Sequence, residues 1–195
     1  MSAELIKIIQ EKFAHSVLAV HAYRGQQTAL IKREALPDVA GFLKDDPTMA
    51  FDFLIDLSCV DYLKFGKSLG SSPTLATPSP LPYYMKSKAM DETWQRGVSN
   101  DEYRFEVVYH FYSSAKNHRL RIKVPLSASD PSVDSITGIW AAANWFEREV
   151  WDMFGVKFNN HPNLRRILMW EEFKGHALRK DYPVNRRQPL IGPLN

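Results

Sequence analysis

Four side chains near the carboxyl end of the chain have the types and spacing of a metal or proton-transfer site. Glu147, Glu149 and Asp152 lie within six residues of one another, and His161 follows nine residues later. Carboxylates together with an imidazole are suitable ligands for a hard or borderline divalent metal. A metal-dependent enzyme built on this cluster is therefore one hypothesis.

Arginines interrupt and follow this cluster. Arg148 stands between the two glutamates, and Arg165 and Arg166 come soon after His161. Guanidinium groups pair with carboxylates through two parallel hydrogen bonds, and such pairs keep the carboxylates ionised, which disfavours a general acid. The sequence favours a structural ion-pair network over a metal or proton-transfer site. The spacing also predicts that Arg148 and Asp152, four residues apart, pair along a helix surface.

Other catalytic signatures are missing from the sequence. The nine glycines never form Gly-x-Gly, which excludes the dinucleotide fingerprint, and the sequence contains no phosphate-binding P-loop. Neither a Gly-x-Ser-x-Gly turn nor a His-Glu-x-x-His helix occurs. The single cysteine, Cys59, cannot form an internal disulfide or a cysteine-ligated cluster alone, and its apolar surroundings predict a buried thiol. We expect no catalytic residue, no bound cofactor and no metal.

The net charge of the chain is concentrated near its carboxyl end. Residues 144–187 contain nine Lys or Arg and six Asp or Glu, an excess that equals the formal net charge of +3 of all 195 residues. Within this region, residues 176–187 are basic with few apolar residues. They favour a solvated terminus, an arm on another protein, or an RNA-binding segment; the interleaved acidic residues count against RNA.

Hydrophobic periodicity predicts the elements that position these residues. Residues 1–130 have the pattern of an α+β domain, a two-layer, helix-covered mixed β-sheet. Its expected helices are an amino-terminal one ending near residue 13 and a short one between residues 37 and 47. Its expected strands are residues 16–23, 28–33, 51–57, 103–111 and 120–124.

The remaining chain divides into an insertion, a helix and an arm. Residues 66–100 are rich in Ser and Pro and lack periodicity, which predicts a surface insertion. Residues 131–158 predict a long helix with its cap, starting near Asp134 or Ser135 and ending at Gly155. Residues 159–195 predict an extended basic arm.

The amino-terminal sequence and the hydropathy predict an intracellular chain that is not embedded in a membrane. Glu4 and Lys7 interrupt the first residues, which differ from a secretory signal or a transit peptide. The longest uncharged run, residues 68–85, contains four prolines and is unsuited to a spanning helix. Association with a membrane would then depend on a partner.

Two segments resemble a known family. Residues 147–168 (EREVWDMFGVKFNNHPNLRRIL) and 175–183 (GHALRKDYP) are similar to the two signature stretches of the 30 kDa subunit family, the C subunits of the proton-pumping NADH–quinone oxidoreductase, respiratory complex I. Residues 60–62, 105–109 and 143–149 fit the same family in the same order. The resemblance covers about 160 residues and is lost only in the insertion.

The resemblance implies a non-redox structural subunit. Such a subunit binds no cofactor and forms a scaffold in the quinone-reducing module, packed against subunits D and B. FMN, iron–sulfur clusters and quinone belong to partner subunits, and the expected location is peripheral, on the cytoplasmic face of the bacterial inner membrane. Related subunits occur in membrane-bound hydrogenases and coenzyme-F420 dehydrogenases, which are the alternative.

The resemblance also assigns roles to particular residues. The signature residues should fix the helix end and the following loop as an assembly surface: Glu147, Arg148, Glu149, Asp152, Gly155, His161, Pro162, Arg165 and Arg166. The second group should anchor the arm to the quinone-reducing partner, the D subunit: His176, Leu178, Arg179, Lys180, Asp181, Tyr182 and Pro183.

Overall fold

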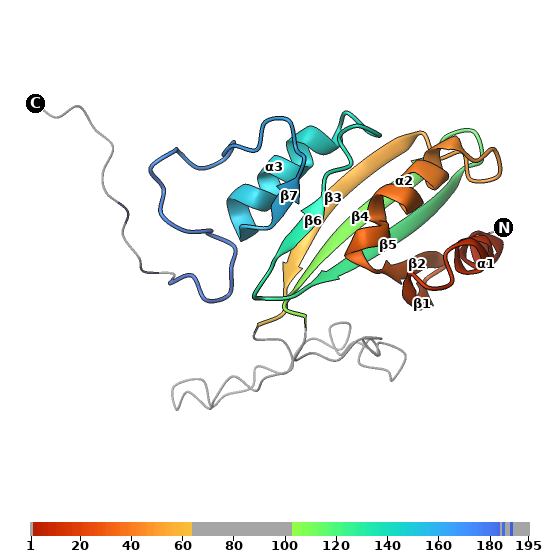
Figure 1. Cartoon of the computed structure of the whole chain (residues 1–195), viewed down its shortest axis with the longest axis horizontal. Coiled ribbons are helices and arrows are strands. Elements are labelled where there is room, and N and C mark those ends of the chain that lie inside the picture. Colours follow the sequence, from red (N-terminus) through yellow and green to blue (C-terminus); the bar gives the residue numbers. More distant parts are fainter. Residues whose placement is uncertain (1, 64–102, 184, 186–187, 189–195) are drawn as a thin grey trace, which may run out of the picture.

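A computed structural model describes residues 2–63, 103–183, 185 and 188 (Figure 1). The predicted insertion at 66–100 lies outside the described residues, and so does most of the chain after residue 183. The described helices and strands are α1 (Ser2–Lys12), β1 (Val17–Tyr23), β2 (Gln26–Ile31), η1 (Arg33–Ala35), α2 (Leu36–Asp45), β3 (Phe53–Asp61), β4 (Phe105–Ser113), β5 (His118–Leu126), β6 (Ser132–Asp134), α3 (Ala143–Phe154) and β7 (Lys157–Asn159).

The main sheet is mixed and has five strands in the order β1-β2-β5-β4-β3. The pair β2–β5 is parallel, whereas β1–β2, β5–β4 and β4–β3 are antiparallel. Arg24 and Gly25 form the turn between β1 and β2, and both have positive φ. A two-residue turn needs this conformation at both positions to match the right-handed twist of the two strands. The α+β fold class and the mixed sheet predicted from the sequence are confirmed.

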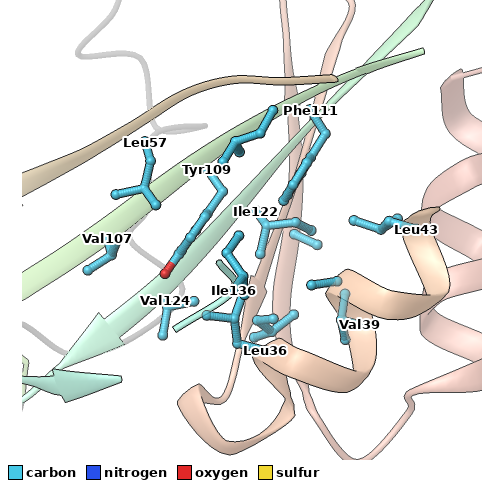
Figure 2. Close-up of a cluster of buried hydrophobic side chains, with 14 of the residues drawn as sticks. Leu36, Val39, Leu43, Leu57, Val107, Tyr109, Phe111, Ile122, Val124 and Ile136 are labelled. Carbon is cyan, nitrogen blue, oxygen red and sulfur yellow. The ribbon is translucent and has the colours of Figure 1, made fainter. Parts of the chain in front are cut away.

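One face of this sheet packs against the helices and forms the core. The side chains that point into the core alternate along each strand, as in the row Leu57, Tyr109 and Ile122 across β3, β4 and β5. Figure 2 shows Val39 and Leu43 of α2 on the side of the core opposite the strands. The lone thiol of Cys59 is buried on this face too, and burial raises its pKa above the ordinary range.

The other face of the sheet carries the alternate residues of the same strands. Ser58, Val108 and Lys123 are cross-strand neighbours on β3, β4 and β5. Among the described elements, the three α-helices contribute to the core on the first face. This second surface is called the open face below.

The helix α3 is shorter than the long helix predicted from the sequence. It begins at Ala143, because β6 pairs in parallel with β7 and two tight turns follow. The carbonyl oxygen of Ile136 accepts the N–H groups of Ile139 and Trp140, and that of Trp140 accepts the N–H of Ala143. These turns bury Ile136 and Trp140 at a spacing that resembles a helix, so periodicity alone placed the start too early.

Candidate functional site

The carboxyl end of α3 places its last side chains against the segment that follows. Gly155 ends the helix in the left-handed conformation, with φ of 73°, and donates its N–H to the carbonyl oxygen of Trp151. Glycine adopts this conformation without steric cost, which explains the predicted stop at this position. The chain then turns through β7 and runs back along α3.

Asp152 organises the returning segment. One of its carboxylate oxygens, Oδ2, accepts three successive backbone N–H groups, from Ile167 at 3.1 Å and from Leu168 and Met169 at 2.9 Å. The other, Oδ1, lies 2.5 Å from Nη1 of Arg166. The side chain is fully buried, so this carboxylate is satisfied entirely by the protein.

Arg166 carries this network further along the chain. Its Nη2 donates to the carbonyl oxygens of Phe173 at 3.0 Å and Gly175 at 3.1 Å. Burial tends to raise the pKa of Asp152, but the backbone donors and the Arg166 guanidinium hold that pKa below its ordinary value. The carboxylate is therefore ionised and fixes the loop through charge-assisted hydrogen bonds.

The predicted arm packs on the end of α3. His176 donates from Nδ1 to the carbonyl oxygen of Asp152 at 3.0 Å. The N–H of Leu178 donates to the carbonyl oxygen of Met153, also at 3.0 Å. The guanidinium of Arg179 donates to the carbonyl oxygen of Phe154. A Cβ atom at Gly155 would lie 2.5 Å from His176. The arm thus satisfies the last carbonyl groups of the helix.

A second ion-pair cluster fixes the arm to the end of the sheet. Arg104 binds the buried Asp61 through two hydrogen bonds, of 3.0 Å and 2.7 Å, and binds Asp181 through two more, of 3.0 Å and 2.8 Å. The N–H of Lys180 donates to Asp61 at 2.8 Å. The hydrogen bonds to Asp61 and Asp181 raise the pKa of Arg104.

Sequence reasoning did not assign a role to Arg104. Its two acidic partners are 43 and 77 residues away, and no local spacing connects them. The available signal was Asp61, an acidic residue at the end of a largely apolar strand, since a buried carboxylate needs a cation.

Tyr182 closes the arm against the returning loop. Its ring stacks on that of Phe173 at 5.8 Å between centroids, and its hydroxyl oxygen accepts a hydrogen bond from Gln188 at 2.6 Å. Pro183 follows at the surface, as does Pro162 in the turn after His161. From residue 176 to residue 182 the arm makes hydrogen bonds to other parts of its own chain. Its anchoring to a partner subunit stays a prediction.

The side chains of Glu147, on α3, and His161, in the segment after β7, are fully buried next to each other. Oε1 of Glu147 accepts the N–H of Ile136 at 2.9 Å, whereas Oε2 lies 4.0 Å from His161 Nε2 and has no hydrogen-bond partner among the described residues. His161 accepts the N–H of Asn163 at Nδ1 and donates from Nε2 to the carbonyl oxygen of Asn144, so the ring is neutral. Burial raises the pKa of Glu147 to about 7.

Replacing Glu147 by Gln should alter how stability depends on pH. Because the folded pKa of about 7 exceeds the ordinary value of 4.5, protonated Glu147 stabilises the fold below pH 4.5, and this contribution is lost as pH rises through 7. Glutamine does not titrate, so the variant does not lose this contribution. Between pH 4.5 and pH 7 the free energy of unfolding of the variant should therefore rise by roughly 3 kcal/mol relative to that of the parent. Urea unfolding of the purified chains at successive pH values measures the difference.

Glu149→Gln is the matched control for this experiment, because Glu149 is two residues away on the same helix and exposed. Its pH profile should match that of the parent. A constant difference between Glu147→Gln and the parent at every pH would contradict the assignment.

The remaining predicted residues do not join a single ion-pair network. Arg148 donates from Nε to the carbonyl oxygen of Arg165 at 3.2 Å, while Asp152 pairs with Arg166, so the predicted pair of Arg148 with Asp152 is wrong. The physical reason is that backbone acceptors and donors of the returning loop compete for both groups. The side chains of Glu149 and Arg165 are exposed.

Within the part of the chain that the structure describes, no group of three or more His, Cys, Asp or Glu side chains is placed to hold a metal ion. Among those same residues, no helix is long and apolar enough to cross a membrane. The hydrogen bonds of Asp152 and Arg166 fix the surface formed by the end of α3 and the returning segment.

That surface exposes large apolar side chains. Trp145 on α3 is 64% exposed, and Leu168, Trp170 and Leu178 on the returning segment are 57%, 38% and 50% exposed. Large apolar groups exposed on a rigidly held polar framework are typical of protein–protein interfaces. We call these four residues the apolar docking residues.

The comparison with known families identifies the class of this chain, the 30 kDa subunits of respiratory NADH dehydrogenases. The family model described as "Respiratory-chain NADH dehydrogenase, 30 Kd subunit" matches residues 29–188. The chain belongs to this family, as the signature residues predicted.

Curated relatives agree with this membership. The chain is 38% identical over 189 residues to the C subunit of the NADH-quinone oxidoreductase of Citrifermentans bemidjiense, covering 96% of this chain and 94% of the relative. It is 39% identical to that of Geobacter metallireducens with the same coverage. In both cases the relative is a subunit of an oxidoreductase complex.

Solved structures show the same fold. One described as Nqo5 of the trypsin-resistant fragment (1-134) is 26% identical with a TM-score of 0.55, covering 82% of this chain and 98% of that one. A chain of the membrane-bound sulfane sulfur reductase, an archaeal respiratory membrane complex, has a TM-score of 0.64 at 17% identity, covering 94% of this chain and 86% of that one. The second likeness concerns the fold alone.

Proposed function

We propose that this chain is a non-redox structural subunit of an NADH:quinone oxidoreductase. In this role it belongs to the peripheral arm on the cytoplasmic face of the membrane and positions the quinone-reducing subunits, D and B. FMN, iron–sulfur clusters and quinone are then held by partner subunits. Family membership and the names of the curated relatives, all C subunits of this enzyme, support this proposal.

The observation that carries the proposal is the way α3 and the returning segment are held. Asp152, Arg166 and the arm use their polar groups within the chain, so that the apolar docking residues remain exposed on a fixed framework. A preformed interface loses little conformational entropy on binding. This arrangement suits a scaffold.

Replacing docking residues should prevent assembly without unfolding the chain. In a double variant, Trp145→Ser and Leu168→Ser, we expect binding to the complex to weaken about thirtyfold or more, since each change removes an exposed apolar contact of ~1–2 kcal/mol and the two add to ~2–4 kcal/mol. Affinity purification of tagged chain from native membranes, followed by detection of iron–sulfur and hydrophobic subunits, measures the yield. Tyr23→Ser, an exposed aromatic residue at the hairpin, is the control.

Two outcomes would count against the proposal. If the parent chain brings down no iron–sulfur subunit, it is not a subunit of such a complex. If the purified chain retains stoichiometric zinc, manganese or iron, the metal-dependent enzyme suggested by the Glu, Asp and His cluster is favoured instead.

A further inference from the structure

A groove crosses the open face of the sheet, on the side away from α3. It has a volume of about 640 Å³ and is lined by Ser58 and Val60 of β3, Val108 and His110 of β4, and Arg121 and Lys123 of β5. Lys180 of the arm forms part of its border. We call it the basic groove.

The strand register explains why these side chains meet. His110 pairs with Arg121, and Val108 with Lys123, in the antiparallel ladder of β4 and β5. Because alternate residues of a strand share one face, two neighbouring rows of the open face combine cations with the apolar Val108. The lining therefore combines two apolar valines with three cations and two carboxylates, Asp56 and Asp61.

The charge of the groove is only partly neutralised within the chain. Lys123 is paired with the buried Glu106 at 2.7 Å. Arg121 donates to the neutral side-chain oxygen of Gln26 at 2.7 Å, and the N–H of Lys180, not its ammonium group, binds Asp61. Asp56 lies in the same cross-strand row as His110 and Arg121 and offsets part of this charge, so Arg121 and Lys180 together leave a small positive excess.

Two histidines lie within the electrostatic influence of Arg121 and Lys123. Burial, together with Arg121 and Lys123, lowers the pKa of His110 against an opposing effect of Asp56. Burial, Lys123 and Arg121 also lower the pKa of His21, which is opposed by Glu106. Burial is the largest cause of both shifts, and the two cations add to it.

We propose that the basic groove binds an acidic segment of a neighbouring protein subunit, as a docking surface separate from α3. Carboxylates of that segment pair with Arg121 and Lys180, while its apolar side chains cover Val60 and Val108. Val60 and Val108 give the groove an apolar surface that a peptide side chain can cover and a phosphate chain cannot, which favours a protein over a nucleic acid. This inference rests on the proposed function, because it requires a multisubunit complex.

Reversing the charge of Arg121 tests the groove within the full complex. Arg121→Glu should lower the yield of complexes purified from native membranes about tenfold, because like charges placed opposite each other across an interface are strongly unfavourable. Arg121→Lys keeps the charge and should retain the parent yield. Lys7→Glu, an exposed charge reversal on α1, is the matched control. The hydrogen bond lost with Arg121 is exposed, so the melting temperature should stay close to that of the parent.

A photocrosslinking residue in place of Val60, which is 37% exposed, identifies the occupant. A crosslink to an acidic segment of another subunit supports the proposal. Crosslinks confined to this chain itself, or to nucleic acid, overturn it, and so does a parent-like yield for Arg121→Glu. If the parent chain recovers partner subunits while Arg121→Glu recovers them equally, only the groove proposal fails. If the parent recovers none, the proposed function fails with it.

Discussion

Asp152→Asn is expected to destabilise the chain by about 3–5 kcal/mol, the usual result of removing one member of a buried charge pair. The asparagine amide would direct a donor at either Arg166 or the backbone N–H groups of residues 167–169, all of which are donors themselves. The loop that carries Leu168 would then lose its fixed shape. Urea unfolding of the purified chain measures the stability, and the yield of assembled complex measures the consequence.

Glu149→Gln separates this effect from a general loss of negative charge on α3. It neutralises an exposed carboxylate three residues away and should change the free energy of unfolding by less than about 0.5 kcal/mol. An Asp152→Asn variant that unfolds at the same urea concentration as this control would contradict the central role of Asp152.

Arg104→Met is expected to cost about 3 kcal/mol and to release the arm from the sheet. The Asp61 side chain is fully buried and Arg104 is 14% exposed, so the variant leaves a buried carboxylate without its cation. Asp181 loses its partner as well, and the peptide bonds after Arg179 and Lys180 should become accessible to protease. Urea unfolding and the rate of tryptic cleavage at these two positions provide independent measurements.

Asp181→Asn is the corresponding control, because Asp181 is 50% exposed and pairs with the other side of the same guanidinium. Partly exposed ion pairs contribute at most about 1 kcal/mol, so this variant should remain nearly as stable as the parent. Equal stability losses for Arg104→Met and Asp181→Asn would show that Asp61 does not require the arginine.

Local patterns in the sequence predicted much of the sheet and the first two helices. Alternation along residues 103–111 and 120–124 corresponds to β4 and β5, and the connection left between the expected strands 16–23 and 28–33 contains the observed turn at Arg24 and Gly25. Alternation identifies a strand and its faces, because the side-chain repeat of a strand is two. It carries no information about which strand lies beside which, and the parallel pairing of β2 with β5 could not be read from it.

The charged residues of the site were recognised, but their partners were not. Arg148 and Asp152 have helix-neighbour spacing, yet each finds a better partner in the loop that returns over α3. Spacing describes neighbours within one helix, whereas buried polar groups are satisfied by whatever segment covers them. Arg104 illustrates the same limit, since only the folded chain brings it to Asp61.

The hydrogen bonds between Asp61 and Arg104 have a consequence for the evolution of this chain. They join residues a few positions before and after residues 64–102, and the N–H of Tyr62 adds a further link to the carbonyl oxygen of Arg104 at 2.9 Å. The separation of the two strand ends is therefore set independently of the number of residues between them. Doubling a connection costs only about 0.6 kcal/mol in closure entropy. This position can accept additions and deletions of sequence while the pairing of β3 with β4 is preserved.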